Sequence, residues 1–239
     1  SKAKKLLKKN MDLFLKVENE FNVEKEILLA LWGIETNFGK HVGKMDIVSC
    51  LATLSFDKRR SKFFSSQLLT LLVLVDKKLV DPNTLFGSWA GALGNFQFMP
   101  SSIKRYAIDY DKNNKIELKN SLNDSLASAA NYINSIGWRK NEPCFFKVEL
   151  SKDLEKKYIN YSAKKIKNKL SVSKWQKKGV IISDNINAFK KFKAGLIMPD
   201  GKSNTPTYLV FNNYEKILKW NRSLRFGITV CTLAEMIKT

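Results

Sequence analysis

The sequence contains few of the residues that mark several common classes of protein. Its 239 residues include 3 cysteines, 5 prolines and 11 glycines, which excludes a disulfide-rich scaffold, a collagen-like repeat and a low-complexity chain. The hydrophobic fraction of 44% excludes intrinsic disorder. No apolar run reaches the roughly 18 residues that span a bilayer, because Asp76 ends the run 68–75. We therefore expect a soluble chain with one large domain, or a core that carries an insertion.

Metal-like groupings of cysteine and histidine are absent as well. Cys50, Cys144 and Cys231 have no metal-like spacing, and we expect all three to be small buried side chains. The single histidine, His41, has no partner in the sequence and is expected at the surface or behind a site.

Acidic residues are scarce, since 22 of them stand against 42 basic residues and leave a formal charge of +20. Such a charge implies an anionic partner, namely nucleic acid, an acidic membrane surface or an acidic polymer. Only Arg59 and Arg60 are adjacent arginines, which disfavours nucleic acid because its phosphates and guanines are recognised by arginine forks. A solvated lysine-rich surface over 152–179 and at the N-terminus is the alternative explanation.

Helical periodicity dominates the first 138 residues. Apolar residues recur at helical spacing over 5–21, and Asn22 is expected to cap a second helix over 23–37. The middle of that helix, 27–34, is apolar on every side, as in a helix buried in a core. Further helical patterns follow at 46–54 behind the capping residue Asp46, at 61–80, from Pro100 and at 124–136.

The pattern changes beyond Trp138. Short β-rich runs at 145–150, 179–182 and 208–211 alternate with lysine, asparagine, glycine and proline. Helical periodicity then returns at 214–220 and 224–237. We expect an inserted strand-bearing subdomain, with the C-terminal part packing back on the N-terminal helices.

Glu35 stands in the last turn of the predicted buried helix, beside Trp32, Ile34 and Phe38. The negative end of the helix dipole and the apolar surroundings both favour the protonated carboxyl. A carboxyl that is protonated near neutral pH is suited to act as general acid in cleaving a glycosidic bond. The alternative is an ordinary glutamate that reaches solvent at a helix end.

Longer motifs carry a resemblance to a known family. They are WGIETNFG at 32–39, LATLSF at 51–56 with the arginine pair, GSWAGALGNFQFMPSS at 87–102, and WNRS at 220–223. In this order they resemble the signatures of the membrane-bound lytic transglycosylase B family, bacterial enzymes that cleave peptidoglycan on a lysozyme-like fold.

The resemblance implies an α+β fold that is mainly α. Its parts would be a lysozyme-like helical core over 1–140 with an ion-binding loop at 109–124, a small inserted strand-bearing subdomain over 141–205, and a C-terminal segment over 206–239 that packs back on the core.

The resemblance also assigns site residues. Glu35 corresponds to the single catalytic acid of the family. The substrate-binding positions correspond to Arg59, Arg60, Ser88, Gln97, Phe98, Met99, Asn221 and Phe226.

These positions differ in their expected roles. Ser88 would place a hydroxyl near the acid, and Gln97 an amide facing the sugar; the arginine pair could reach wall carboxylates. Each of these roles has an open alternative. Ser88 could be a turn residue, Met99 could pack in the core, and the arginines could mark a solvated helix start. Phe226 stands where relatives often carry tyrosine, and Phe96 replaces a residue that is usually small.

A polar loop has the spacing of a calcium-binding loop. Oxygen side chains stand at positions 1, 3 and 5, and a backbone carbonyl at position 7. The residues are Asp109, Asp111, Asn113 and Lys115, and the resemblance supplies Asp124 as the last ligand. The loop lacks the usual glycine at position 6, where Asn114 could adopt a left-handed conformation. We expect a structural calcium or sodium ion, with a metal-free polar turn as the alternative.

The implied activity is that of a lytic transglycosylase, which cleaves the β-1,4 bond between N-acetylmuramic acid and N-acetylglucosamine and forms 1,6-anhydromuramic acid. Glu35 would act as both acid and base, and the chemistry needs no cofactor. The alternatives are a hydrolytic muramidase, for which Asp46 and Asp57 are the nearest second carboxylates in sequence, and a non-catalytic peptidoglycan-binding protein.

The expected partners are peptidoglycan glycan strands, with cell-wall synthesis or division complexes as further candidates, and no nucleic acid. We expect a periplasmic monomer, with membrane contact only through an N-terminal anchor upstream of Ser1. The sequence leaves open whether such an anchor exists and whether the protein associates with the outer membrane.

Overall fold

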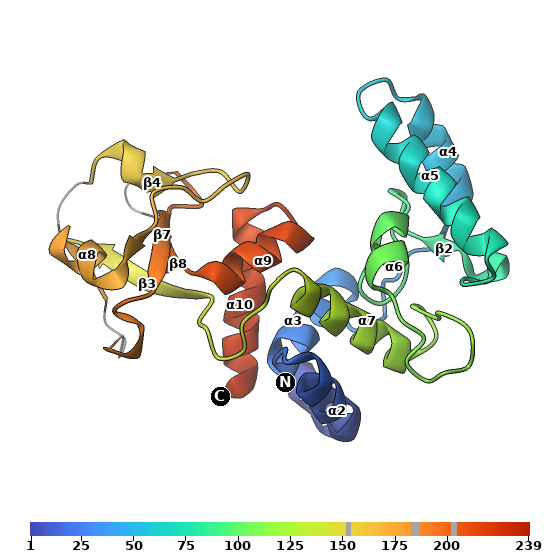
Figure 1. The fold of residues 1–239 in the computed structure, drawn as a ribbon, viewed down its shortest axis with the longest axis horizontal. Coiled ribbons are helices and arrows are strands. Elements are labelled where there is room, and N and C mark those ends of the chain that lie inside the picture. Colours follow the sequence, from blue (N-terminus) through green and yellow to red (C-terminus); the bar gives the residue numbers. More distant parts are fainter. Residues whose placement is uncertain (152–153, 183–186, 202–204) are drawn as a thin grey trace. The chain divides into compact units, whose positions relative to one another are not determined.

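The computed structural model describes residues 1–151, 154–182, 187–201 and 205–239, and it forms two compact units, Ser1–Ser135 and Ile136–Thr239 (Figure 1). The division falls close to residue 140, where we expected the strand-bearing part to begin. The predicted packing of the C-terminal segment on the helical core concerns the relation between the units and stays a prediction.

Helices form most of the first unit. They are α1 (Lys2–Lys9), α2 (Met11–Phe21), α3 (Lys25–Thr36), α4 (Ile47–Phe56), α5 (Ser61–Asp76), α6 (Pro100–Tyr106) and α7 (Leu122–Ser135). Two short strands, β1 (Met45–Asp46) and β2 (Phe86–Gly87), pair antiparallel, and a single 3-10 turn, η1 (Pro82–Thr84), precedes β2.

Helix α3 is the predicted buried helix. The four residues Leu28, Leu29, Ala30 and Leu31 have no exposed surface, and α3 packs against α1, α2 and α7. Each fully buried leucine stabilises the fold by about 1.5–3 kcal/mol, so the all-round apolar pattern is what fixes α3 in the core.

Two helix boundaries near the N-terminus differ from the prediction. The expected single helix over 5–21 is interrupted at Asn10, whose backbone N–H and side-chain Nδ2 both donate to the Leu6 carbonyl. The prediction that Asn22 caps the following helix is wrong. Asn22 has a φ of 53° and ends α2 instead, because asparagine tolerates the left-handed conformation of a helix C-terminus.

Helices α4 and α5 lie side by side as an antiparallel pair (Figure 1). Asp46 caps α4 as predicted, since its Oδ1 accepts from the backbone N–H groups of Val48 and Ser49 at 2.8 and 3.2 Å. Helix α5 ends at Asp76 rather than at Val80, and Lys78 turns the chain with a φ of 58°.

The second unit contains strands at the three predicted runs and three further strands that were not predicted from the sequence. In its described residues these are β3 (Phe145–Leu150), β4 (Ile159–Asn160), β5 (Leu170–Ser171), β6 (Val180–Ile181), β7 (Lys193–Ile197) and β8 (Thr207–Val210). They make one sheet in the order β4-β7-β8-β3-β6, with β5 also paired to β7. All neighbours are antiparallel except β4 and β7. The sheet therefore extends past residue 205, where we expected the subdomain to end.

Helices and short 3-10 turns complete this unit. They are α8 (Val172–Lys177), α9 (Asn212–Trp220), α10 (Leu224–Lys238), η2 (Lys156–Tyr158) and η3 (Asn187–Phe189). Trp175 of α8 is fully buried against the sheet, and its Nε1 donates to the Ala194 carbonyl at 2.8 Å.

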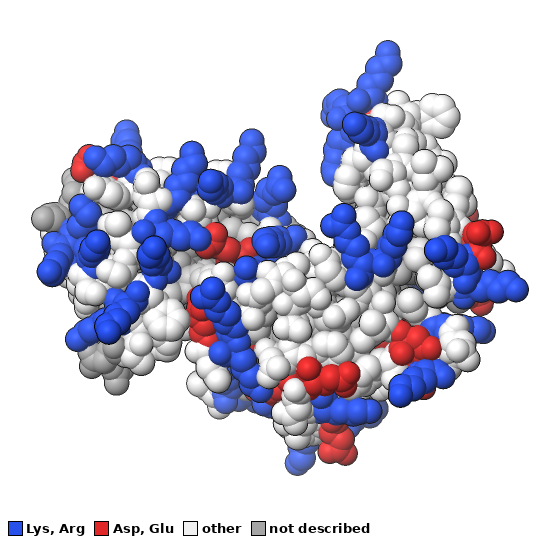
Figure 2. Space-filling model, in the orientation of Figure 1, with Lys and Arg blue, Asp and Glu red and all other residues white. Residues whose placement is uncertain are grey.

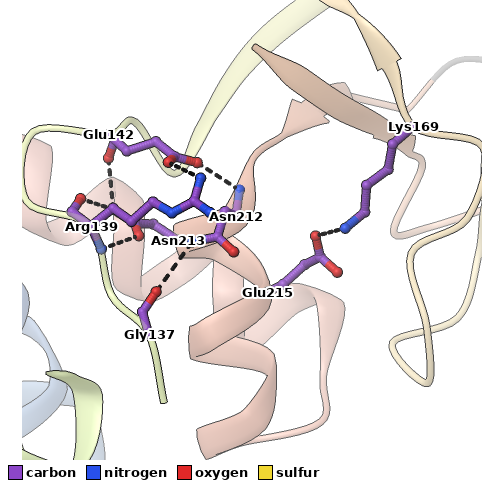
Figure 3. Close-up of polar contacts among 7 residues, drawn as sticks. All are labelled: Gly137, Arg139, Glu142, Lys169, Asn212, Asn213 and Glu215. Carbon is purple, nitrogen blue, oxygen red and sulfur yellow. Dashed lines mark hydrogen bonds and ion pairs between the residues drawn. The ribbon is translucent and has the colours of Figure 1, made fainter. Parts of the chain in front are cut away.

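A buried carboxylate holds the start of the second unit to α9 (Figure 3). Glu142, whose side chain is 6% exposed, accepts from the backbone N–H of Asn212 at 3.0 Å and pairs with Arg139. Asn213 donates to the carbonyls of Arg139 and Glu142. Phe211 at the helix N-cap offers no side-chain acceptor, so Glu142 replaces the usual cap.

Lysine and arginine side chains cover much of the visible face of the second unit (Figure 2). In the part of the chain that the structure describes, none of the helices combines the length and apolar character needed to cross a membrane. The prediction of three buried cysteines is right only for Cys231, because Cys50 and Cys144 are partly exposed.

Candidate active site

The last turn of α3 carries Glu35, and the chain after it is sharply turned. Asn37 and Phe38 have left-handed φ angles of 50° and 60°. The ring of Phe38 lies edge-on to Trp32, with centroids 5.7 Å apart. Gly33 leaves room for this ring, because a Cβ there would lie 2.8 Å from Phe38 Cζ. Glu35 is partly buried at this fixed helix end.

A buried asparagine, Asn95, ties the end of α3 to the glycine-rich segment 87–99. Its Oδ1 accepts from Trp32 Nε1 at 3.0 Å, and its backbone carbonyl accepts from Thr36 Oγ1 at 2.8 Å. Its Nδ2 donates to the two backbone carbonyls of 118–119. The side chain is shielded from water, which strengthens these hydrogen bonds.

Sequence reasoning did not select Asn95 as a functional residue. Its partners Thr36 and Trp32 stand 59 and 63 residues away in the chain, and no spacing rule connects them. We interpret Asn95 as a positioning residue, since it fixes the helix turn that carries Glu35.

Gln97 follows in the same segment, with a φ of 50°. Its Nε2 donates to the carbonyls of Val42 at 3.2 Å and Gly94 at 2.9 Å. The segment 87–99 is thus joined to the end of α3 by Asn95 and to the loop after α3 by Gln97. The helix end that carries Glu35 and the segment that carries Gln97 are therefore held together by hydrogen bonds.

Ser88 stands in a tight turn of the same segment. Its Oγ accepts from the Ala92 N–H at 3.0 Å, and its own N–H donates to the Ala92 carbonyl at 2.9 Å. Gly87 permits this turn, because a Cβ there would lie 2.1 Å from the Ala92 oxygen. In its local contacts Ser88 is therefore a turn residue, which was the alternative interpretation. A role of its hydroxyl near Glu35 stays a prediction.

Two of the three aromatic residues of the segment, Phe96 and Phe98, are buried, whereas Trp89 is exposed. Phe98 is 3% exposed and packs edge-on against Tyr132, with centroids 5.9 Å apart. Phe96 is also 3% exposed. Met99 is partly exposed and directly precedes α6. Phe98 and Met99 were predicted to line the cleft, and of these two only Met99 has an exposed side-chain surface. Both roles stay predictions.

The adjacent arginines lie between α4 and α5. Arg59 is exposed and forms a bidentate pair with Asp57, with Nη2 and Oδ2 2.6 Å apart. This guanidinium lowers the pKa of Asp57 to about 2. The Arg60 guanidinium lies 4.6 and 4.9 Å from the ring centroids of Phe63 and Phe64. Both cations are accessible, and substrate binding by them stays a prediction.

Asn221 and Phe226 belong to the second unit. Asn221 is exposed at the C-terminal end of α9, and its N–H donates to the Ile217 carbonyl. Phe226 lies in the first turn of α10, where its N–H donates to Ser223 Oγ. Their contribution to a site with Glu35 stays a prediction.

The two carboxylates considered for a hydrolytic mechanism have structural partners. Asp46 caps α4, and Asp57 holds Arg59. Both carboxylates thus have structural roles within or beside α4.

The polar loop gathers the predicted aspartates. One carboxylate oxygen from each of Asp109, Asp111 and Asp124 lies within 4.8 Å of the others. Asp124 is fully buried and accepts from the backbone N–H groups of Tyr110 and Glu117 at 2.8 and 2.9 Å. Burial raises the pKa of Asp124, and these backbone donors oppose the rise.

The remaining predicted ligands shape the turn. Asn113 Oδ1 accepts from the Lys115 N–H at 2.9 Å, and Asn114 has the expected left-handed φ of 68°. The chemistry of these oxygen donors fits a hard cation such as calcium. Ion binding itself stays a prediction.

Comparisons with known proteins identify relatives of the chain. Residues 1–235 match the family model described as the transglycosylase SLT domain. The membrane-bound lytic murein transglycosylase B of Escherichia coli strain K12 is 42% identical over 123 residues, which are 51% of this chain and 34% of the relative. The match thus spans about a third of that relative's length.

Solved structures resemble the whole chain. SltB3 from Pseudomonas aeruginosa in complex with NAG-NAM-pentapeptide has a TM-score of 0.91 at 30% identity, and the match covers 99% of this chain and 63% of SltB3. SltB3 in complex with NAG-anhNAM-pentapeptide has a TM-score of 0.89 at 31% identity, and the match covers 99% of this chain and 62% of SltB3. The Escherichia coli lytic transglycosylase Slt35 in complex with calcium has a TM-score of 0.84 at 28% identity, covering 99% of this chain and 73% of Slt35. The predicted lysozyme-like fold class is confirmed.

Proposed function

Since the chain belongs to the family of transglycosylase SLT domains, we propose that it is a lytic transglycosylase that cleaves peptidoglycan between N-acetylmuramic acid and N-acetylglucosamine. The observation that carries this proposal is the framework around Glu35. A single partly buried glutamate ends an apolar helix, and Asn95 fixes that helix end to the segment that holds Gln97.

Glu35 performs both proton transfers in this proposal. Its carboxyl donates a proton to the glycosidic oxygen as the bond from that oxygen to C1 of muramic acid breaks. The resulting carboxylate then takes the proton of the C6 hydroxyl, whose oxygen bonds to C1 and closes the 1,6-anhydro ring. The products contain every atom of the substrate, and no water is consumed.

The surroundings of Glu35 suit this double role. Residues 28–31 of α3 are fully buried, and Trp32 and Phe38 form an apolar pair at the helix end. Such surroundings favour a protonated carboxyl before the reaction. Gln97 is proposed to orient the sugar through its amide, and Arg59 and Arg60 to bind carboxylates of the lactyl or peptide groups.

A hydrolytic muramidase is the competing function. Inverting and retaining hydrolases generally require a second carboxylate at a defined distance from the acid. Asp46 and Asp57, the candidates from the sequence, are engaged in capping α4 and in holding Arg59. A non-catalytic wall-binding protein would have no need for Glu35.

The substitution Glu35→Gln tests the catalytic proposal. Glutamine keeps the shape and polarity of the side chain but transfers no proton, so the rate of release of soluble fragments from sacculi should fall by about 100-fold or more. Binding to sacculi should be preserved. Glu235→Gln, at an exposed position of α10, is the control and should keep full activity. Full activity in Glu35→Gln would refute the assignment.

We further propose that the polar loop holds a structural calcium ion. The ligands would be Asp109, Asp111, Asn113, the carbonyl of Lys115, and Asp124. The ion would tie the loop to α7, which begins beside Asp124, and it would take no part in the chemistry. Support comes from the clustered oxygens and from the calcium complex of Slt35.

The cellular setting is proposed on the same basis. The family membership and the membrane-bound Escherichia coli relative favour a periplasmic protein with peptidoglycan strands as its partner. Fractionation of cells and measurement of binding to purified sacculi test this setting.

A further inference from the structure

The positive charge of the chain is concentrated in its second unit. Residues 136–239 contain 22 basic and 8 acidic residues, which leaves a formal charge of +14. Residues 1–135 contain 20 basic and 14 acidic residues, which leaves +6. A uniform excess of lysine along the chain therefore does not explain the charge of the second unit.

The acidic side chains of the second unit do not neutralise this charge. Five of its six described acidic residues each form an ion pair with one basic residue, and they are Glu142, Glu155, Asp200, Glu215 and Glu235. One-to-one pairs of this kind neutralise only a minority of the 22 basic residues. The unit therefore presents an excess of cations to solvent.

Some of these cations gather around α8. Figure 2 shows basic side chains over the part of the second unit where α8 lies in Figure 1. Four exposed lysines and one half-buried lysine form what we call the α8 lysine surface, namely Lys174, Lys177, Lys178, Lys190 and Lys191. The chain at Lys190 runs beside the start of α8, because its carbonyl accepts from Ser173 Oγ at 2.8 Å. In the described part of the chain, no ion pair involves any of the five.

The packing of α8 turns its lysines outward. Its two apolar residues, Val172 and Trp175, are fully buried. Positions 174, 177 and 178 follow the spacing that places side chains on one helix face, and this face is opposite the buried pair. Tyr158 lies edge-on to Trp175, with ring centroids 6.0 Å apart, and Lys178 Nζ lies 4.3 Å from the centroid of the Tyr158 ring. The helix is thus anchored by its apolar side, and its basic side is free to bind.

The chemistry of this surface favours an anionic polymer of the cell wall. Lysine is a point charge on a flexible stem and suits carboxylates that vary in position, whereas the surface has no arginine fork for phosphates or guanines. Binding of a helix to a lipid surface needs an apolar face, and the apolar residues of α8 are buried. The peptide stems of peptidoglycan carry carboxylates along every glycan strand.

We propose that the α8 lysine surface is a second contact with peptidoglycan, at which the lysine ammonium groups bind carboxylates of the peptide stems. The inference rests on the proposed function, and it adds a contact in the unit that does not carry Glu35. A single exposed ion pair contributes little. Several lysines acting together on a polymer with repeated charges hold the enzyme on the wall.

The experiment measures binding to purified sacculi without turnover. All chains carry Glu35→Gln, so the wall is not cleaved, and a negative result leaves the catalytic proposal intact. The surface variant combines four substitutions, Lys174→Gln, Lys177→Gln, Lys190→Gln and Lys191→Gln. Its affinity for sacculi should fall about 10-fold at low salt. The difference should vanish at about 0.5 M salt, where exposed charges are screened.

A matched control removes the same charge from the other unit. Its four substitutions are at exposed positions of α1, namely Lys4→Gln, Lys5→Gln, Lys8→Gln and Lys9→Gln. This control should bind sacculi as Glu35→Gln alone does. Circular dichroism should show that both variants keep their fold, since every substituted side chain is exposed.

Modified sacculi test the carboxylates themselves. A carbodiimide with ethanolamine converts the carboxylates of the wall to neutral amides. Glu35→Gln alone should bind these sacculi more weakly than untreated ones, and the surface variant should bind them equally weakly. A loss of affinity that persists on the amidated wall would overturn the proposal, and so would unchanged binding of the surface variant or an equal loss in the α1 control. Binding that depends on these lysines for phosphatidylglycerol vesicles or duplex DNA, and not for sacculi, would also overturn it.

Discussion

Replacing Asn95 by alanine tests whether this buried side chain positions the catalytic turn. The substitution removes the acceptor of the Trp32 indole N–H and the donor to the Lys119 carbonyl. It also removes the donor to Ser125 Oγ, but that hydroxyl keeps its own bonds to backbone carbonyls. The Leu118 carbonyl keeps the backbone N–H of residue 95 and the Ser125 hydroxyl as donors. The main cost is therefore one buried indole N–H and one partly buried carbonyl left unsatisfied.

The expected loss of stability follows from the number of polar groups that lose their hydrogen-bond partner. An unsatisfied buried polar group costs about 1–3 kcal/mol, so Asn95→Ala should lower the free energy of unfolding of the first unit by about 2–4 kcal/mol. Activity should fall in addition, by about 10- to 100-fold at a temperature where the variant is folded, because small displacements of a catalytic group are costly. The contact of Thr36 with the backbone carbonyl at 95 survives, so the fold should be retained.

Urea unfolding followed by circular dichroism, together with release of soluble fragments from sacculi, measures both effects. Asn83→Ala, at an exposed position in η1, is the control and should change neither. If Asn95→Ala unfolds within about 0.5 kcal/mol of the unaltered chain and keeps its activity, the reasoning about the framework around Glu35 is wrong.

Three other predictions follow from the structure. Replacing Arg59 and Arg60 together by alanine should weaken binding to sacculi by about 1–3 kcal/mol while the maximal rate changes little; unchanged binding would remove them from the site. Glu142→Gln should lower the free energy of unfolding by about 1–2 kcal/mol because it removes a buried charged cap. Its control, Glu215→Gln, breaks a more exposed pair with Lys169 (Figure 3) and should cost less than about 1 kcal/mol. Equal losses in chemical denaturation would contradict the capping role of Glu142. Calcium should raise the melting temperature and a chelator should lower it, and Asp124→Asn should abolish the difference; a melting temperature indifferent to both reagents would show that the loop is a turn alone.

Local patterns predicted the parts of the fold that depend on neighbouring residues. The all-round apolar stretch of α3 is buried, and Asp46 caps α4, because helix periodicity and capping act within one or two turns. Asn22 was misassigned because asparagine suits both ends of a helix. The sequence around it does not say which end it serves.

The site was predictable only where residue types are tied to chemistry. Glu35 is distinguished by a carboxyl in an apolar helix end, and the aspartate loop by its oxygen spacing. The positioning role of Asn95 was not predictable, because it depends on hydrogen bonds with Trp32 and Thr36 that form only after α3 has packed.

The mass of the sugar ends released from intact sacculi tests the proposed reaction most directly. Attack by the C6 hydroxyl adds no water, so the account predicts 1,6-anhydromuramic ends that are about 18 mass units lighter than hydrolytic products, and it predicts their loss in Glu35→Gln. Reducing muramic ends as the main product would contradict the account and would assign the chain to the hydrolytic muramidases.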